Sequence, residues 1–114
     1  MTANTMHDDQ RHSRRVSIPE QPKIYDAHSG EVIGELVNLS SDGLMAANSE
    51  CICSGSICQV RIPLIKGKRL VDIHVGVESL WCEDANNSGT YWTGFQIIDI
   101  SPEDQLILDA IVGI

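Results

Sequence analysis

Apolar and polar residues alternate along six stretches of the chain, and this alternation predicts β-strands. In the longest stretch, valine and isoleucine occupy every second position from Val71 to Val77. Glycine, asparagine and serine gather between the stretches, as they do in turns. The predicted strands are Lys23–Ala27, Glu31–Leu39, Leu44–Ala47, Ile57–Ile65, Arg69–Cys82 and Thr90–Ile100.

The period of the pattern changes after Ile100 and predicts a short helix over residues 101–113. Ser101 can cap the helix, Pro102 suits its first position, and two acidic residues follow in the first turn. Its expected apolar face consists of Leu106, Leu108, Ile111 and Val112. Antiparallel strands with tight turns and one terminal helix indicate a small barrel or curled sheet, with the helix covering one opening.

The length and composition predict one globular domain. The chain has 114 residues, of which 42% are hydrophobic, and no apolar run is long enough to cross a membrane. Residues 1–15 lack any periodic pattern, so we expect a flexible segment there and the folded domain at 16–114. The first ten residues are polar and do not resemble a secretory signal, which favours a cytoplasmic protein.

The charge of the chain restricts its partners. The formal net charge is -8, which argues against a protein that binds duplex DNA or RNA through a broad basic face. Residues 1–15 hold three arginines and two aspartates, whereas the remainder holds five basic and fourteen acidic residues. We therefore expect a small anion to be attracted to the N-terminal segment and a polyanion to be repelled elsewhere.

Four cysteines, Cys51, Cys53, Cys58 and Cys82, raise the alternative of a metal or thiol redox site, together with His74. Their spacing matches no common zinc pattern, and reduced thiols without a metal are the expectation. No catalytic triad, paired carboxylates or phosphate-binding glycine loop is recognisable, so we expect neither an enzyme nor a cofactor.

Two short motifs occur in order along the chain. The first is Arg11-x-x-x-Arg15, and the second is Asn38-x-Ser40-x-x-Gly43 at the end of a predicted strand. This pair resembles the two-part motif of the PilZ domain, and the order of strands and the closing helix fit that family too. The resemblance implies an all-β fold, a six-stranded antiparallel Greek-key-like barrel with a short C-terminal α-helix. It also implies binding of the bacterial second messenger cyclic di-GMP.

The resemblance assigns roles to the residues of both motifs. Arg11 and Arg15 can each bind a phosphate or the acceptor edge of a guanine, and Arg14 lies between them as a further candidate contact. The amide oxygen of Asn38 can accept from guanine N1 or N2. The family often has aspartate at this position, which would accept more strongly, so a somewhat lower affinity is expected here.

Three further residues complete the predicted site. Ser40 can donate to or accept from a base or phosphate, and Gly43 lets the turn reverse without a side chain in the way of the ligand. Trp81 ends the longest strand and could stack beside a guanine or pack the barrel rim. The motif around Ser40 and Gly43 could also be only a structural turn.

The function implied by the resemblance is that of a cyclic di-GMP receptor or adaptor. Its N-terminal segment would fold over the ligand and signal to a partner protein in motility, biofilm or exopolysaccharide control. The alternatives are a PilZ-type adaptor that docks a protein without nucleotide, and a single-strand nucleic-acid barrel, which the acidic charge disfavours. One or two ligands per chain, and a monomer or a homodimer, remain open.

Overall fold

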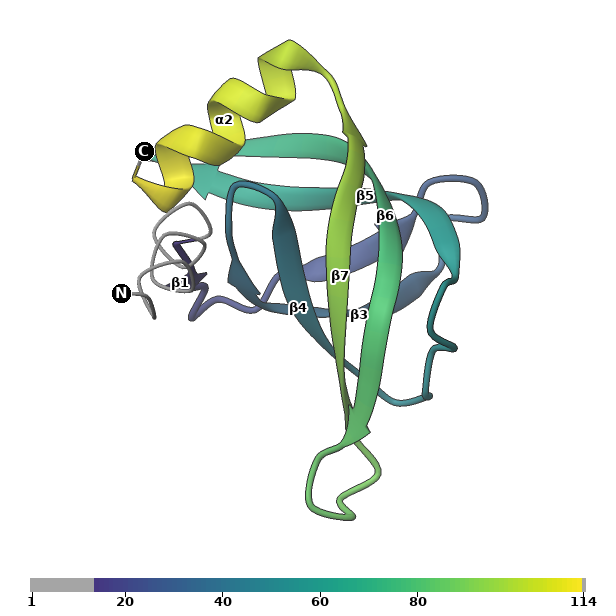
Figure 1. Cartoon of the computed structure of the whole chain (residues 1–114). Helices are drawn as coiled ribbons and strands as arrows, with labels where there is room; N and C mark the ends of the chain where they lie inside the picture. Colours follow the sequence, from purple (N-terminus) through teal and green to yellow (C-terminus); the bar gives the residue numbers. More distant parts are fainter. Residues whose placement is uncertain (1–13, 114) are drawn as a thin grey trace, which may run out of the picture.

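The computed structural model describes residues 14–113, which form an antiparallel sheet that closes on itself and a single helix (Figure 1). The strands are β1 (Val16–Ser17), β2 (Lys23–Asp26), β3 (Val32–Leu39), β4 (Gly43–Asn48), β5 (Ile57–Lys66), β6 (Arg69–Asp84) and β7 (Tyr91–Ile100), and the helix is α2 (Pro102–Val112). The six predicted strands correspond to β2–β7, with ends that differ by at most two residues. The flexibility predicted for residues 1–15 stays a prediction, because residues 1–13 lie outside the described part of the chain.

The sheet has the order β1-β3-β2-β5-β6-β7-β4, and an additional β3–β4 pairing closes six of the strands into a barrel. Every pairing is antiparallel. The β4–β5 connection joins strands that are not neighbours, which gives the Greek-key-like path. The short β1 adds to the outer end of β3. The predicted all-β, six-stranded antiparallel barrel with a C-terminal helix is therefore confirmed, with one extra strand.

Alternation along the strands directs one side chain in two into the barrel. In β6 the inward residues include Ile73, Val75 and Val77, which are completely or almost completely buried. Phe95 of β7 and the leucines of β3 and β4 join the same core. This inward set leaves the intervening residues of β3, β4, β6 and β7 on the outer surface, where the predicted site lies.

The helix α2 starts at the expected capping residue and ends at a glycine. The Ser101 hydroxyl accepts a hydrogen bond from the Asp104 amide at 3.1 Å, and Gly113 ends the helix with φ 85°. Leu108 and Val112 are buried in the barrel core, so α2 covers one opening, as expected (Figure 1). Leu106 was wrongly placed on the apolar face, since it is 71% exposed. Each residue turns an α-helix by about 100°, so Leu106, two residues before Leu108, points about 200° away from it around the helix axis.

Candidate functional site

The second motif begins at the end of β3, where an irregularity in the strand directs Asn38 outward. The β3–β4 register shifts between Leu36 and Asn38, which leaves Val37 as the extra residue of a bulge. Leu36 is completely buried, whereas Asn38 is half-buried and pairs with Ser17 of β1. The bulge thus places the Asn38 amide on the outer surface between β1 and β4.

Ser40 shapes the turn that follows. Its side chain is completely buried, and its hydroxyl donates to the Asp42 carboxylate at 2.9 Å. Its backbone amide donates to the Gly43 carbonyl at 2.8 Å, which closes the turn. In this structure the Ser40 hydroxyl is therefore engaged inside the turn.

Gly43 is required by the close approach of two strands. A Cβ on Gly43 would lie 2.7 Å from the Phe95 carbonyl oxygen of β7, closer than van der Waals contact allows. The same Cβ position is 3.9 Å from Nη2 of Arg15. Gly43 therefore lets β4 pack against β7 and also lies directly beside the Arg15 guanidinium.

Arg15 joins the two motifs. Its Nη1 donates a hydrogen bond to Oδ1 of Asn38 at 2.8 Å, although the two residues are 23 positions apart in the chain. Pairing of Val16 with Leu39, the first contact of β1 with β3, holds Arg15 at this point. The Arg15 guanidinium is exposed and keeps further N–H groups that can bind an anion. The structure thus brings Arg15, Asn38 and Gly43 together.

Arg14 points to a different place. Its Nη1 lies 3.4 Å, and its Cζ 3.8 Å, from the position that a Cβ on Gly113 would occupy at the end of α2. The last turn of α2 contains no basic residue of its own. A guanidinium beside the carbonyl end of a helix is favoured by the helix dipole. Arg14 is therefore separated from Arg15 and placed at the C-terminus of α2.

Trp81 lies on the same outer face as Asn38. A register shift between Ser79 and Trp81 turns the tryptophan outward, and it pairs with Gly94 of β7. Gly94 pairs with Met45 of β4, and Met45 pairs with Asn38 of β3. Directly paired residues share one face of a sheet. Asn38, Met45, Gly94 and Trp81 therefore form a continuous row across four strands, which we call the outer row.

The Trp81 indole covers Gly94. Three of its ring atoms occupy the space that a Cβ on Gly94 would fill, and the tryptophan is 39% exposed. Because Gly94 has no side chain, the ring can lean from β6 across β7 towards Met45. The sequence indicated Trp81 but not Gly94 or Met45, and only the register between strands shows that they belong to one surface.

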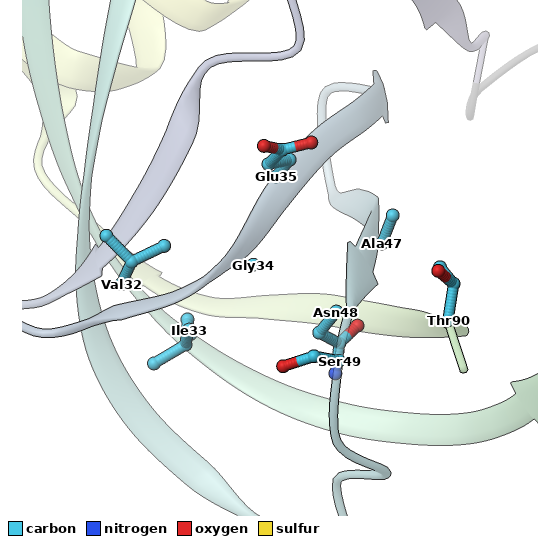
Figure 2. Close-up of a pocket in the computed structure, with 8 residues that line it drawn as sticks. All are labelled: Val32, Ile33, Gly34, Glu35, Ala47, Asn48, Ser49 and Thr90. Atoms are coloured by element: carbon cyan, nitrogen blue, oxygen red, sulfur yellow. The ribbon is translucent and has the colours of Figure 1, made fainter.

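A separate hollow of about 290 Å³ lies between the other ends of β3 and β4 (Figure 2). It is lined by Val32, Ile33, Gly34, Glu35, Ala47, Asn48, Ser49 and Thr90. None of the predicted site residues contributes to it. Its single charged residue is Glu35, whose carboxylate would repel a phosphate. Arg15, Asn38 and Gly43 instead lie together on the open surface around the Arg15 guanidinium.

The remaining predictions concern Arg11 and the cysteines. Arg11 lies outside the described residues. Within residues 14–113, no group of three or more histidine, cysteine or acidic side chains could hold a metal ion. In the same part of the chain, no helix is long and apolar enough to span a membrane.

A comparison with protein families matches residues 9–113 to the PilZ domain. The chain belongs to the PilZ domain family. The match covers both motifs, including Arg11, and extends to the last residue that the structure describes. The resemblance carried by the two motifs is therefore confirmed at the level of the family. A comparison with curated protein sequences gave no match.

Solved structures share the fold of this PilZ domain at low sequence identity. The Bacillus subtilis inhibitor of motility (MotI/DgrA) superposes with a TM-score of 0.73 at 15% identity, over 87% of this chain and 47% of that one. The PilZ domain of YcgR from Escherichia coli with c-di-GMP gives 0.68 at 16% identity, over 91% and 89%. YcgR from Escherichia coli in complex with c-di-GMP gives 0.71 at 18% identity, over 91% and 45%. The chain thus spans about half the length of MotI/DgrA and of the longer YcgR chain.

Proposed function

We propose that this PilZ domain is a receptor for cyclic di-GMP, which binds on the outer row beside Arg15. The observation that carries the proposal is the Arg15–Asn38 hydrogen bond next to Gly43, which joins both halves of the family motif on one exposed surface. Membership of the PilZ family supports the ligand, as do the solved YcgR structures that contain c-di-GMP.

Arg15 supplies the charge that holds the ligand. Its guanidinium can bind a phosphate, or O6 and N7 of a guanine, through two parallel hydrogen bonds. Each such bond to a charged group contributes about 1.5–3 kcal/mol. Because Asn38 already accepts from Arg15, the amide also orients the guanidinium and can turn its oxygen towards guanine N1 or N2 when the ligand arrives.

The outer row offers a surface on which a flat base can lie. Met45 and the Trp81 ring, which covers Gly94, are the apolar parts of this row. Neighbouring strands are about 4.8 Å apart, so three strand spacings separate Asn38 from Trp81 by roughly 14 Å. A guanine bound by Arg15 and Asn38 would therefore lie over Met45, with Trp81 at its far edge. Trp81 then adds an aromatic contact beside the base.

The segment before Arg14 completes the site in this proposal. Arg11 is a second guanidinium for the other phosphate or guanine, and the segment folds over the bound ligand. Ser40 and Gly43 contribute by holding the turn in shape. The charge distribution supports a small anion as ligand, because acidic residues dominate the rest of the chain.

The signal would reach a partner protein through α2, which contacts both motifs. Gln105 of α2 donates through Nε2 to the Ser41 carbonyl at 3.2 Å, and Arg14 lies beside Gly113. A ligand that attracts Arg14 would remove it from the end of α2. This movement changes the surface that α2 presents, and no chemical step is needed. The similarity to MotI/DgrA, an inhibitor of motility, supports motility control as the setting.

Isothermal titration of the purified chain with cyclic di-GMP tests the proposal. We expect saturable micromolar or tighter binding, and Arg15→Ala should weaken it at least about tenfold because a charge-assisted contact is lost. Arg69→Ala is the matched control, since Arg69 is an exposed arginine at the start of β6 that belongs to neither motif nor to the outer row. Thermal unfolding of the free Arg15→Ala protein should stay close to that of the wild type.

Three results would contradict the proposal. One is the absence of heat or fluorescence change up to high micromolar cyclic di-GMP. Another is an equal loss of affinity for Arg15→Ala and Arg69→Ala. The third is partner capture that is independent of the nucleotide, which would favour the adaptor that docks a protein without ligand.

A further inference from the structure

Two cysteines that are distant in the chain, Cys51 and Cys82, bring their thiols into contact. Cys51 is exposed in the loop between β4 and β5, and Cys82 is half-buried near the end of β6. The two thiols are close enough to shift each other's pKa in opposite directions. Neither residue belongs to the proposed nucleotide site, so nucleotide binding does not explain this contact.

The loop that carries Cys51 is held along β6 by several hydrogen bonds. Ser54 Oγ donates to the Leu80 carbonyl at 3.0 Å, and the Gly55 amide donates to the Ser79 carbonyl at 2.7 Å. Ser79 Oγ in turn donates to the Cys53 carbonyl at 2.5 Å. On the other side of this loop, Thr93, the ladder partner of Cys82, donates to Oδ1 of Asn48 at 3.1 Å, and Asn48 Nδ2 donates to the Glu50 carbonyl next to Cys51 at 2.7 Å. Hydrogen bonds on both sides of Cys51 therefore hold the loop beside Cys82.

The surroundings of the two sulfurs give their thiols different pKa values. Burial by itself raises the pKa of the Cys82 thiol, but hydrogen bonds, led by that from Cys51 and including one from the Ile52 amide, lower it below its ordinary value. The hydrogen bond to Cys82 raises the pKa of Cys51, and burial adds to this effect. Cys82 is therefore the better thiolate and Cys51 the accessible partner beside it.

We propose that Cys51 and Cys82 are a redox modification site that closes to a disulfide by exchange with a low-molecular-weight disulfide such as oxidised glutathione. The Cys82 thiolate attacks one glutathione sulfur, the glutathione disulfide breaks, and the first glutathione leaves as a thiolate that takes up a proton. Cys51 then loses its proton to water and attacks the Cys82 sulfur. The mixed disulfide breaks, and the second glutathione leaves. The two cysteines lose two electrons, which reduce the glutathione disulfide to two thiols.

The other two cysteines are poorer partners. Cys58 is half-buried on β5, where burial, followed by the charge of Asp26, raises the pKa of its thiol. It pairs with Val77 of β6, several residues before Cys82. Cys53 is exposed, and its backbone is bound to Ser79 rather than to Cys82. They provide matched controls in the same protein.

Oxidised glutathione, applied to the folded wild type and to four single variants, tests the assignment. Free-thiol counting should fall from the four thiols of the reduced wild type to two, and non-reducing peptide mapping should join Cys51 to Cys82. Cys53→Ser and Cys58→Ser should keep this bridge. Cys82→Ser should lack it, and Cys51→Ser should accumulate a glutathione adduct on Cys82, because the second step is missing. Dithiothreitol should restore all thiols.

Two outcomes would overturn the proposal. The first is a bridge that includes Cys53 or Cys58 as often as Cys51. The second is a wild type that carries only glutathione adducts while its thermal transition shows that it is folded. A failure to bind cyclic di-GMP would not affect this test, since its readouts are thiols and peptides.

Discussion

At the scale of single residues, two glycines set the closest approaches around the site, and they do so against different neighbours. Beside Gly43 the neighbour is the backbone carbonyl of Phe95, which belongs to the β4–β7 ladder and cannot move alone. Beside Gly94 the neighbour is the indole of Trp81, the far end of an exposed side chain. The same added methyl group should therefore have different consequences at the two positions.

Gly43→Ala should destabilise the protein by about 1–3 kcal/mol, since β4 must move away from β7. Gly94→Ala should cost much less stability, because the Trp81 ring can swing into solvent. Chemical unfolding measures the first effect. Trp81 fluorescence in a Trp92→Phe background measures the second as a shift of the emission towards longer wavelength. Equal stability losses for both variants would show that the close contact of Gly43 with the Phe95 carbonyl does not limit what β4 can accommodate.

At the scale of elements, α2 has one face packed against the barrel and one face exposed to solvent. Leu108 is completely buried and Leu106 is 71% exposed, although both are leucines in the same helix. Leu108 fills the barrel opening together with Val112 and the strand residues around it. Burial against the barrel, rather than helix propensity, is what holds an element of only three turns in place.

Leu108→Ala should lower the free energy of unfolding by about 2–5 kcal/mol through lost burial and a cavity. Leu106→Ala, the matched control, should change it by less than about 0.5 kcal/mol, as is usual for surface positions. Urea unfolding followed by circular dichroism measures both. A large loss for Leu106→Ala without one for Leu108→Ala would mean that α2 packs through the opposite face.

At the scale of the whole molecule, the proposed ligand site and α2 meet at one corner of the barrel. Figure 1 shows β1 beside the C-terminal end of α2, and the contact of Arg14 with Gly113 lies there. Gln105 adds a second link, from α2 to the turn between β3 and β4. The two ends of the described chain are thereby joined next to the surface that carries Arg15.

Hydrogen exchange with and without cyclic di-GMP should detect this link, provided that the nucleotide binds as proposed. Ligand that draws Arg14 away should speed exchange in the last turn of α2, where the Gly113 amide donates to the Asp109 carbonyl. Arg14→Ala should show faster exchange there without ligand and no further change with it. Binding that leaves α2 exchange unaltered in the wild type would remove α2 from the signalling path.

Local patterns determined the elements and the family of this protein. Alternation along residues 69–82 was sufficient to predict β6, because a strand with one buried face must alternate. Ser101 and Pro102 indicated the start of α2 through their capping and backbone chemistry. The two short motifs, together with the order of the predicted strands and the closing helix, carried the resemblance to the PilZ family.

Tertiary structure alone decided how these parts meet, because strand register and helix rotation depend on contacts between distant residues. The sequence could not show that Arg15 reaches Asn38 while its neighbour Arg14 goes to the end of α2. It could not place Ser40 inside its turn or Leu106 in solvent. The contact of Cys51 with Cys82 likewise exists only because the barrel lays the loop along β6.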